Sequence, residues 1–145
     1  MSAAKSSKPK ETAASRWLSY RPEIKVVDCT IRDGGLMNSH HFPDQIVKVV
    51  YDTCVAAGVD YMELGYKASR KGIKQGEHGC WKYCVEEDLR RIVGDNKTAL
   101  KLCVMADAER CDYREDILPK KDSALDMIRV ATYINQIPTA LEALL

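Results

Sequence analysis

The stretch Asp28-Cys29-Thr30-Ile31-Arg32-Asp33-Gly34-Gly35 decides the fold of this chain. The apolar residues just before it predict a buried strand over residues 24–30. Gly34-Gly35 would stop that strand, because paired glycines adopt backbone angles that other residues resist. Arg32 and Asp33 are therefore expected at the strand's carboxyl end, where ligands bind in α/β folds built from parallel strands.

Arg32 and Asp33 together suggest a ligand site. A guanidinium matches an oxyanion, and a carboxylate suits a hard divalent cation. The alternative is an ordinary ion pair at a solvated turn, which the dipeptide alone does not exclude.

Strands and helices alternate through the rest of the chain. Apolar residues at helical spacing follow Asp44, a candidate helix cap, and the helix is expected to end at Gly58. The further elements expected are a strand over 61–64, a helix containing Leu89, Ile92 and Val93 that stops at Gly94, strands over 99–105 and 128–131, and a helix that opens near Gln136 with Pro138 in its first turn. This order predicts a parallel sheet with right-handed crossovers.

The motif Asp-x-Thr-x-Arg-Asp-Gly at residues 28–34 resembles the signature of the DRE-TIM metallolyases, the pyruvate-carboxyltransferase-like (HMGL-like) barrels. Residues 58–67, which include Glu-Leu-Gly-Tyr-Lys, resemble that family's second strand, and residues 126–131 resemble its fourth. Within the family, the motifs are most similar to the 4-hydroxy-2-oxovalerate aldolase-like branch.

The resemblance implies an α/β fold, the amino-terminal half of a TIM (β/α)8 barrel with about four βα units and parallel strands. A whole barrel needs about 250 residues, and this chain has 145. We expect a mobile tail and lead-in over residues 1–20, and a partial barrel over residues 21–145 that is truncated in its fourth helix.

The chemistry that the resemblance implies is metal-dependent carbon–carbon lyase or aldolase activity, or a Claisen-type acyl transfer, on a 2-oxo acid through a pyruvate-type enolate. Asp33 would bind Mn²⁺ or Mg²⁺, and Arg32 would stabilise the enolate. Glu63 would orient the arginine or relay a proton. The alternative for Glu63 is a buried partner of a lysine or arginine.

Lys67, Asp107 and Arg129 are further candidates for substrate binding, because each follows or lies within a predicted strand. Arg129 would point into the barrel to meet substrate, or outward beside a helix.

A histidine is also expected near the site. In 4-hydroxy-2-oxovalerate aldolases a catalytic histidine closely follows Arg-Asp-Gly, but Leu36 holds that position here. His40 and His41 come next, and we take His41 as a candidate, although paired histidines in a loop are more often exposed.

The family's other metal ligands, a His-x-His pair on a late strand, have no counterpart in this sequence, so the isolated chain is expected to be inactive. It would need a complementing half-barrel or a second copy. The competing hypothesis is a non-catalytic half-barrel remnant that binds a partner, or itself, through open strand edges.

Composition limits the partners and the compartment. A formal net charge of +1 gives no electrostatic case for nucleic acid or membrane binding, and no apolar run suggests a membrane span. The six cysteines match no disulfide framework and predict reduced thiols in the cytoplasm. Cys80 and Cys84, expected on one helix face near His78, offer a second metal site only if further ligands join them.

Overall fold

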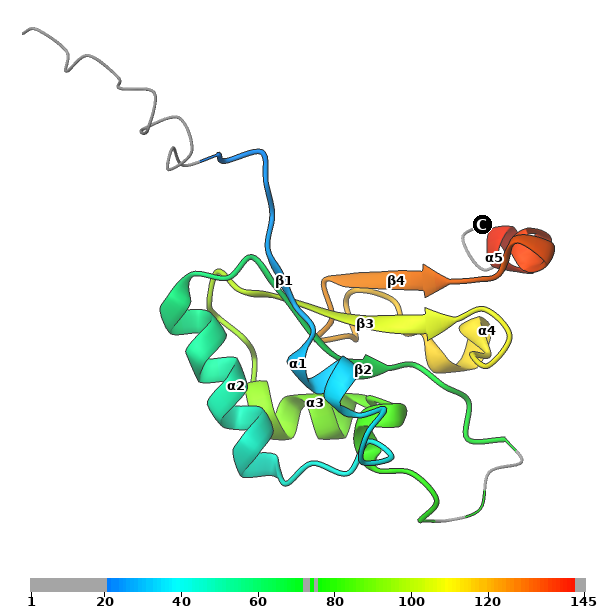
Figure 1. Ribbon diagram of the computed structural model, residues 1–145, viewed down its shortest axis with the longest axis horizontal. Coiled ribbons are helices and arrows are strands. Elements are labelled where there is room, and N and C mark those ends of the chain that lie inside the picture. The colour runs from blue at the N-terminus through cyan, green and yellow to red at the C-terminus, as the bar shows by residue number, and fades with distance from the viewer. Residues whose placement is uncertain (1–20, 72–73, 75, 143–145) are drawn as a thin grey trace, which may run out of the picture.

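The structure is a computed structural model that describes residues 21–71, 74 and 76–142. The expected tail over residues 1–20 and the last three residues of the expected final helix lie outside the described residues. One parallel sheet forms the centre of the fold, in the order β1-β2-β3-β4 (Figure 1). The strands are β1 (Val27–Asp28), β2 (Tyr61–Tyr66), β3 (Lys101–Asp107) and β4 (Met127–Ala131).

Helices follow each strand in sequence, which confirms the predicted α/β, half-barrel-like arrangement. They are α1 (Thr30–Gly34), α2 (Asp44–Ala57), η2 (Cys80–Lys82), α3 (Glu86–Val93), α4 (Tyr113–Asp116), η3 (Ile134–Gln136) and α5 (Ile137–Glu142). Pro138 lies in the first turn of α5, as expected. Within the described part of the chain, no helix is both long enough and apolar enough to cross a membrane.

The first strand is much shorter than predicted. It ends at Asp28, whose carboxylate accepts hydrogen bonds from the Thr30 amide and hydroxyl at 3.2 and 2.8 Å. These bonds turn the chain into α1, whose first backbone bond runs from the Asp33 amide to the Cys29 carbonyl. The prediction that the strand continues to Thr30 is therefore wrong, and Arg32 and Asp33 lie on a short helix just after the strand.

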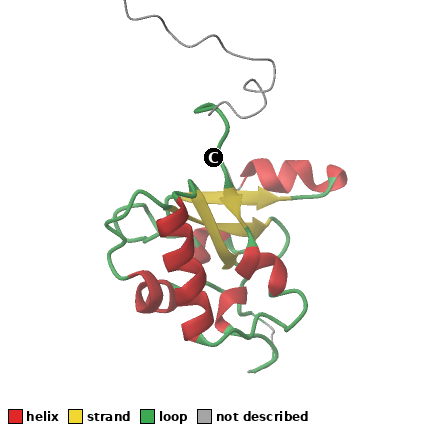
Figure 2. Cartoon of the chain, turned by 60° about the vertical axis from the view of Figure 1, so that its left-hand side comes forward, coloured by secondary structure: helices red, strands yellow, loops and turns green. Residues whose placement is uncertain are grey.

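The helices α2 and α3 pack on one face of the sheet (Figure 2). A buried apolar cluster joins this face to the helices; its members include Met62, Leu64, Leu102, Val104, Val47, Tyr51, Cys54, Leu89, Ile92 and Trp81. Asp44 begins α2 but does not cap it, because its carboxylate pairs with Arg91 of α3 at 2.6 Å. Gly58 ends α2 with φ 68°, as predicted.

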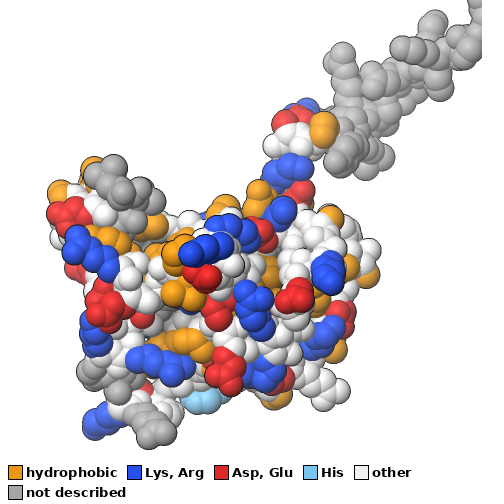
Figure 3. All heavy atoms as spheres, turned by 180° about the vertical axis from the view of Figure 1, so that it is seen from behind, with side chains coloured by type: hydrophobic (Ala, Val, Ile, Leu, Met, Phe, Trp, Pro, Cys, Tyr) orange, Lys and Arg blue, Asp and Glu red, His pale blue; other side chains and the backbone are white. Residues whose placement is uncertain are grey.

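The opposite face of the sheet carries the polar residues that matter for function. In the sheet register Glu63 pairs with Cys103, and Met105 pairs with both Tyr66 and Arg129. Partnered residues of parallel strands point the same way, so all five lie on the face away from α2 and α3. Figure 3 shows one surface of the molecule, where basic and acidic side chains are intermixed.

Candidate functional site

Glu63 is the centre of a charged cluster on the open face of the sheet. Its side chain is fully buried, and it accepts three hydrogen bonds from arginines. Arg129 donates from Nε to Oε1 and from a terminal nitrogen to Oε2, both at 2.7 Å, and Arg32 donates from Nε to Oε2 at 2.8 Å. The Cys29 thiol lies 3.5 Å from the same Oε2.

The arginines keep Glu63 ionised. Burial alone would raise the pKa of this carboxyl, but the hydrogen bonds from Arg129 and then Arg32 outweigh it and lower the pKa below its ordinary value. A buried carboxylate held by two guanidinium groups is geometrically fixed, because each bond restricts both partners. The cluster therefore brings α1, β2 and β4 together.

Arg32 is held on several sides. Its Nε binds Glu63, a terminal nitrogen lies 2.6 Å from Asp33, and 16% of its side chain is exposed. Burial lowers the pKa of Arg32, but hydrogen bonding by Tyr66, then Glu63 and Cys29, more than reverses this and raises it. The guanidinium is thus a permanent, oriented cation with limited contact with solvent.

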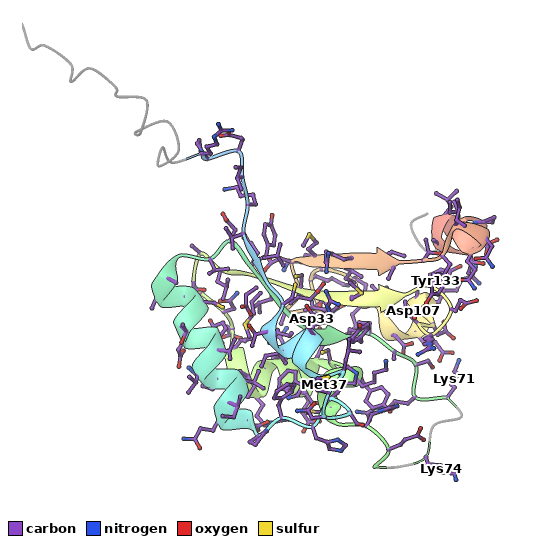
Figure 4. All side chains as sticks on the ribbon, in the orientation of Figure 1. Asp33, Met37, Lys71, Lys74, Asp107 and Tyr133 are labelled. Carbon is purple, nitrogen blue, oxygen red and sulfur yellow. The ribbon has the colours of Figure 1, made fainter. Side chains whose placement is uncertain are left out.

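Asp33 lies at the surface beside Arg32, with 56% of its side chain exposed (Figure 4). Within residues 21–71, 74 and 76–142, no group of three or more His, Cys, Asp or Glu side chains could hold a metal ion. A Mg²⁺ or Mn²⁺ site combines several oxygen or imidazole ligands. Asp33 and its described neighbours therefore do not fit a divalent ion by themselves.

The cysteine pair does not make a second metal site. Cys80 begins the short helix η2, which ends at Lys82, so Cys84 is not on a shared helix face with it. Cys84 is fully buried, and burial raises the pKa of its thiol far above the ordinary value. Cys84 donates to the Trp81 carbonyl at 3.4 Å.

A β-bulge decides which residues of β2 reach the site. The register with β3 shifts between Glu63 and Tyr66, so Tyr66 lies on the same face as Glu63. Gly65 lies in this bulge, where a Cβ would collide with the Trp81 carbonyl oxygen and the Cys84 sulfur. The next residue, Lys67, is turned to the helix face, and its Nζ donates to the Cys84 carbonyl at 2.8 Å.

The bulge accordingly corrects the expectation for Lys67. Simple alternation along the strand places residues 63, 65 and 67 on one face, and the inserted residue reverses this. Lys67 is buried away from the Glu63 cluster, and Tyr66 takes the place beside Arg32.

The other candidates fall in different places. Arg129 points to the open face, not outward beside a helix, because it binds Glu63. Asp107 ends β3 on the same face but is well separated from Asp33 in Figure 4. Its carboxylate accepts a hydrogen bond from the Glu109 amide at 3.2 Å and lies 3.7 Å from Arg110.

His41 is exposed, and its Nδ1 lies 3.2 Å from the Asn38 carbonyl oxygen. The structure instead brings His40 toward the site. His40 is 3% exposed, and its ring meets the Tyr66 ring edge-on with centroids 5.3 Å apart. Burial, followed by the charges of Lys82, His78 and His41, lowers the pKa of His40 to about 4.

Sequence reasoning therefore missed three residues near the cluster, Cys29, Tyr66 and Lys82, and it favoured His41 over His40. Lys82 lies 4.5 Å from the centre of the Tyr66 ring. Cys29 and Tyr66 lie three positions from Arg32 and Glu63, within the motifs at residues 28–35 and 58–67. That short separation in sequence could have indicated that they lie near the cluster. Lys82 lies in a loop–helix segment whose position no sequence pattern gives.

A cavity of about 290 Å³ opens at the carboxyl end of β2, apart from Glu63. Its lining includes Lys67, Arg70, Tyr83 and Glu86.

The chain resembles the crystal structure of the N-terminal domain of a putative aldolase from Bacteroides vulgatus, with 27% sequence identity and a TM-score of 0.64. The match covers 83% of this chain and 40% of that chain, so this chain spans about two fifths of the domain it resembles. A scan against protein-family models and a search of curated proteins find no match.

Proposed function

We propose that this chain carries the enolate-stabilising part of an aldolase-type carbon–carbon lyase, or of a related Claisen-type acyltransferase, that acts on a 2-oxo acid. The observation that carries the proposal is the buried Glu63 carboxylate held between Arg32 and Arg129. The similarity to the N-terminal domain of a putative aldolase and the DRE-TIM-like motif support the same reaction class.

In a retro-aldol reaction of a 4-hydroxy-2-oxo acid, the bond between C3 and C4 breaks. The 4-hydroxyl proton passes to a base, an aldehyde leaves, and the electron pair of the broken bond forms an enolate with its charge on the C2 oxygen. Arg32 would donate to that oxygen, which lowers the barrier because a preoriented cation meets charge as it develops. Protonation at C3 then gives pyruvate.

We assign Glu63 to orienting Arg32 and not to moving a proton. Both of its oxygens already accept hydrogen bonds from guanidinium groups, and its pKa lies below the ordinary value. A carboxylate in that state is a poor base. Arg129 has 39% of its side chain exposed, so it would also meet the substrate carboxylate.

We also propose a divalent metal ion, for which Asp33 is the one candidate ligand among the described residues. Asp33 would be a ligand of Mn²⁺ or Mg²⁺, and the other ligands would come from outside the described residues. We assign Asp107 a rim position only, and we give Lys67 and His41 no part in this reaction.

Oxalate, a planar analogue of the pyruvate enolate, provides the test on the 145-residue chain. We expect calorimetry to detect oxalate binding that Arg32→Ala weakens by about tenfold or more, since a charged hydrogen bond is lost. Lys101→Met is the matched control, because Lys101 is an exposed cation that pairs with Asp126. Binding unchanged in Arg32→Ala would contradict the proposal. Pyruvate release with a complementing half-barrel supplied then tests turnover.

The second candidate function is a non-catalytic interaction module. It is favoured by apolar side chains exposed at and before the edge strand β1: Ile24 is 58% exposed and Val26 is 54% exposed. An open edge strand invites pairing with a second copy or with a complementing half-barrel. Sedimentation of the chain alone, and after Val26→Lys, would detect such pairing. The six free cysteines support a reducing, cytoplasmic setting for either candidate.

A further inference from the structure

Lys67 is a buried cation for which the described residues provide no counter-ion. The residue is 4% exposed, and its ammonium donates one hydrogen bond, to the Cys84 carbonyl at 2.8 Å. An ammonium has three donors, and a buried charge is costly unless it is paired. No carboxylate in the described ranges forms an ion pair with Lys67.

Lys67 lines the 290 Å³ cavity at the end of β2. That volume is at the lower limit of ligand pockets and suits a small ligand. Arg70 lines the same cavity, with its guanidinium 4.9 Å from the centre of the Tyr83 ring. Stacking on an aromatic face leaves the hydrogen-bonding edge of a guanidinium available.

The carboxylates around the cavity already have partners. Glu86 accepts from the Ser123 hydroxyl at 2.7 Å and the Ala124 amide at 2.8 Å. Glu115 pairs with Lys71 at 2.9 Å, and Asp116 accepts from the Asp112 amide at 2.8 Å. Lys67 and Arg70 are therefore the cationic side chains of the cavity lining that take no part in these contacts.

We propose that this cavity binds a small oxyanion, a phosphate or carboxylate group, with Lys67 at its base and Arg70 at its rim. The site is separate from the Glu63 cluster, because the bulge turns Lys67 to the other face of the sheet. The inference does not depend on the aldolase proposal.

Thermal unfolding of the full chain tests it in phosphate, in malonate and in chloride at matched ionic strength. We expect phosphate, malonate or both to raise the melting temperature in the wild type, as any ligand of the folded state does. A rise with one anion alone identifies the oxyanion as a phosphate or as a carboxylate. Lys67→Met should abolish the rise and, in chloride, melt higher than the wild type, because it removes an unpaired buried charge.

Two further variants keep the outcome decisive. Arg70 is exposed, so Arg70→Gln should leave the chain folded. It should weaken the binding of the anion by about tenfold. Lys101→Met, the same change as at position 67 but at a distant exposed cation, should keep the full effect. The proposal is overturned if neither anion raises the wild-type melting temperature above that in chloride, or if the rise persists in both Lys67→Met and Arg70→Gln.

Discussion

Glu63 and Arg129 are 66 positions apart in the sequence, yet two hydrogen bonds of 2.7 Å join their side chains. The pair connects β2 to β4 across β3, and Arg32 adds the contact to α1. The cluster is thus the candidate site, and it also links three elements of the half-barrel: α1, β2 and β4.

Glu63→Gln should destabilise the fold. The amide keeps the shape of the side chain but loses the charge, which leaves two arginines beside a neutral group. Breaking a buried pair by removing one partner costs about 3–5 kcal/mol. Urea unfolding at neutral pH measures this cost. A loss below about 1 kcal/mol would show that solvent screens the arginines as it does at the surface.

The same variant should change how stability depends on pH. The pKa of Glu63 is lowered in the folded state from its ordinary value of 4.5. A lowered carboxyl pKa contributes stability that is complete above the unfolded value and is lost as pH falls through the folded value. The wild type should therefore lose stability below pH 4.5 more steeply than Glu63→Gln. Equal slopes in acid would contradict the assignment.

Arg32→Lys should not replace the arginine. A lysine keeps one positive charge but lacks the planar fork that binds Glu63 and, in the proposed reaction, would also donate to the enolate oxygen. In an assembled enzyme, we expect Arg32→Ala to slow pyruvate release by about 10² to 10³, with Arg32→Lys recovering little of it. The measurement is the rate with a complementing half-barrel and Mn²⁺. Full recovery by lysine would mean that charge alone suffices.

Gly65→Ala should be more harmful than Gly58→Ala. A Cβ at Gly58 meets open space, so the cost there is the left-handed φ of 68°, about 1–2 kcal/mol. A Cβ at Gly65 would collide with the Trp81 carbonyl and the Cys84 sulfur, so the backbone of η2 or β2 must move. We expect a larger loss of unfolding free energy and a weaker response to oxalate. Equal losses of unfolding free energy in the two variants would indicate that the backbone of η2 moves away from the added methyl group at little cost.

His40 should make the fold sensitive to mild acid. Its pKa is lowered to about 4 in the folded state from an ordinary value of 6.5, so the unfolded chain binds more protons between these values. Stability should fall as pH drops from 6.5 towards 4. His40→Asn suits the test, because asparagine tolerates the positive φ of 62° at this position.

The variant should flatten the pH dependence in that window. The matched control is His41→Asn, which changes the exposed neighbour. If His40→Asn and the wild type show the same slope, the buried imidazole is not the source.

The sequence predicted the parallel sheet from the alternation of strands and helices, and the family resemblance implied that Glu63 meets Arg32. It also predicted the ends of α2 and α3 at Gly58 and Gly94, where local backbone geometry decides. It failed at β1, where the Asp28 carboxylate captures the backbone of Thr30 and starts a helix early. Such a side-chain–backbone bond leaves no periodic trace in the sequence.

The sequence also misplaced Lys67 and chose the wrong member of the His40–His41 pair to lie near the cluster. Both errors come from tertiary contacts. The backbone of η2 presses on Gly65, and the loop after Gly35 folds His40 inward against Tyr66. Neither packing arrangement follows from alternation or composition.

The bulge in β2 has a practical consequence for anyone who aligns this chain with other proteins. Residues of this chain that precede the bulge align with another protein by their distance in sequence from Glu63. Residues that follow the bulge align by their distance from Tyr66. A relative without the extra residue would carry its counterpart of Tyr66 two positions after its glutamate and its counterpart of Lys67 three positions after it. Roles transferred across this point by position alone would then exchange a residue of the charged cluster for a residue of the cavity.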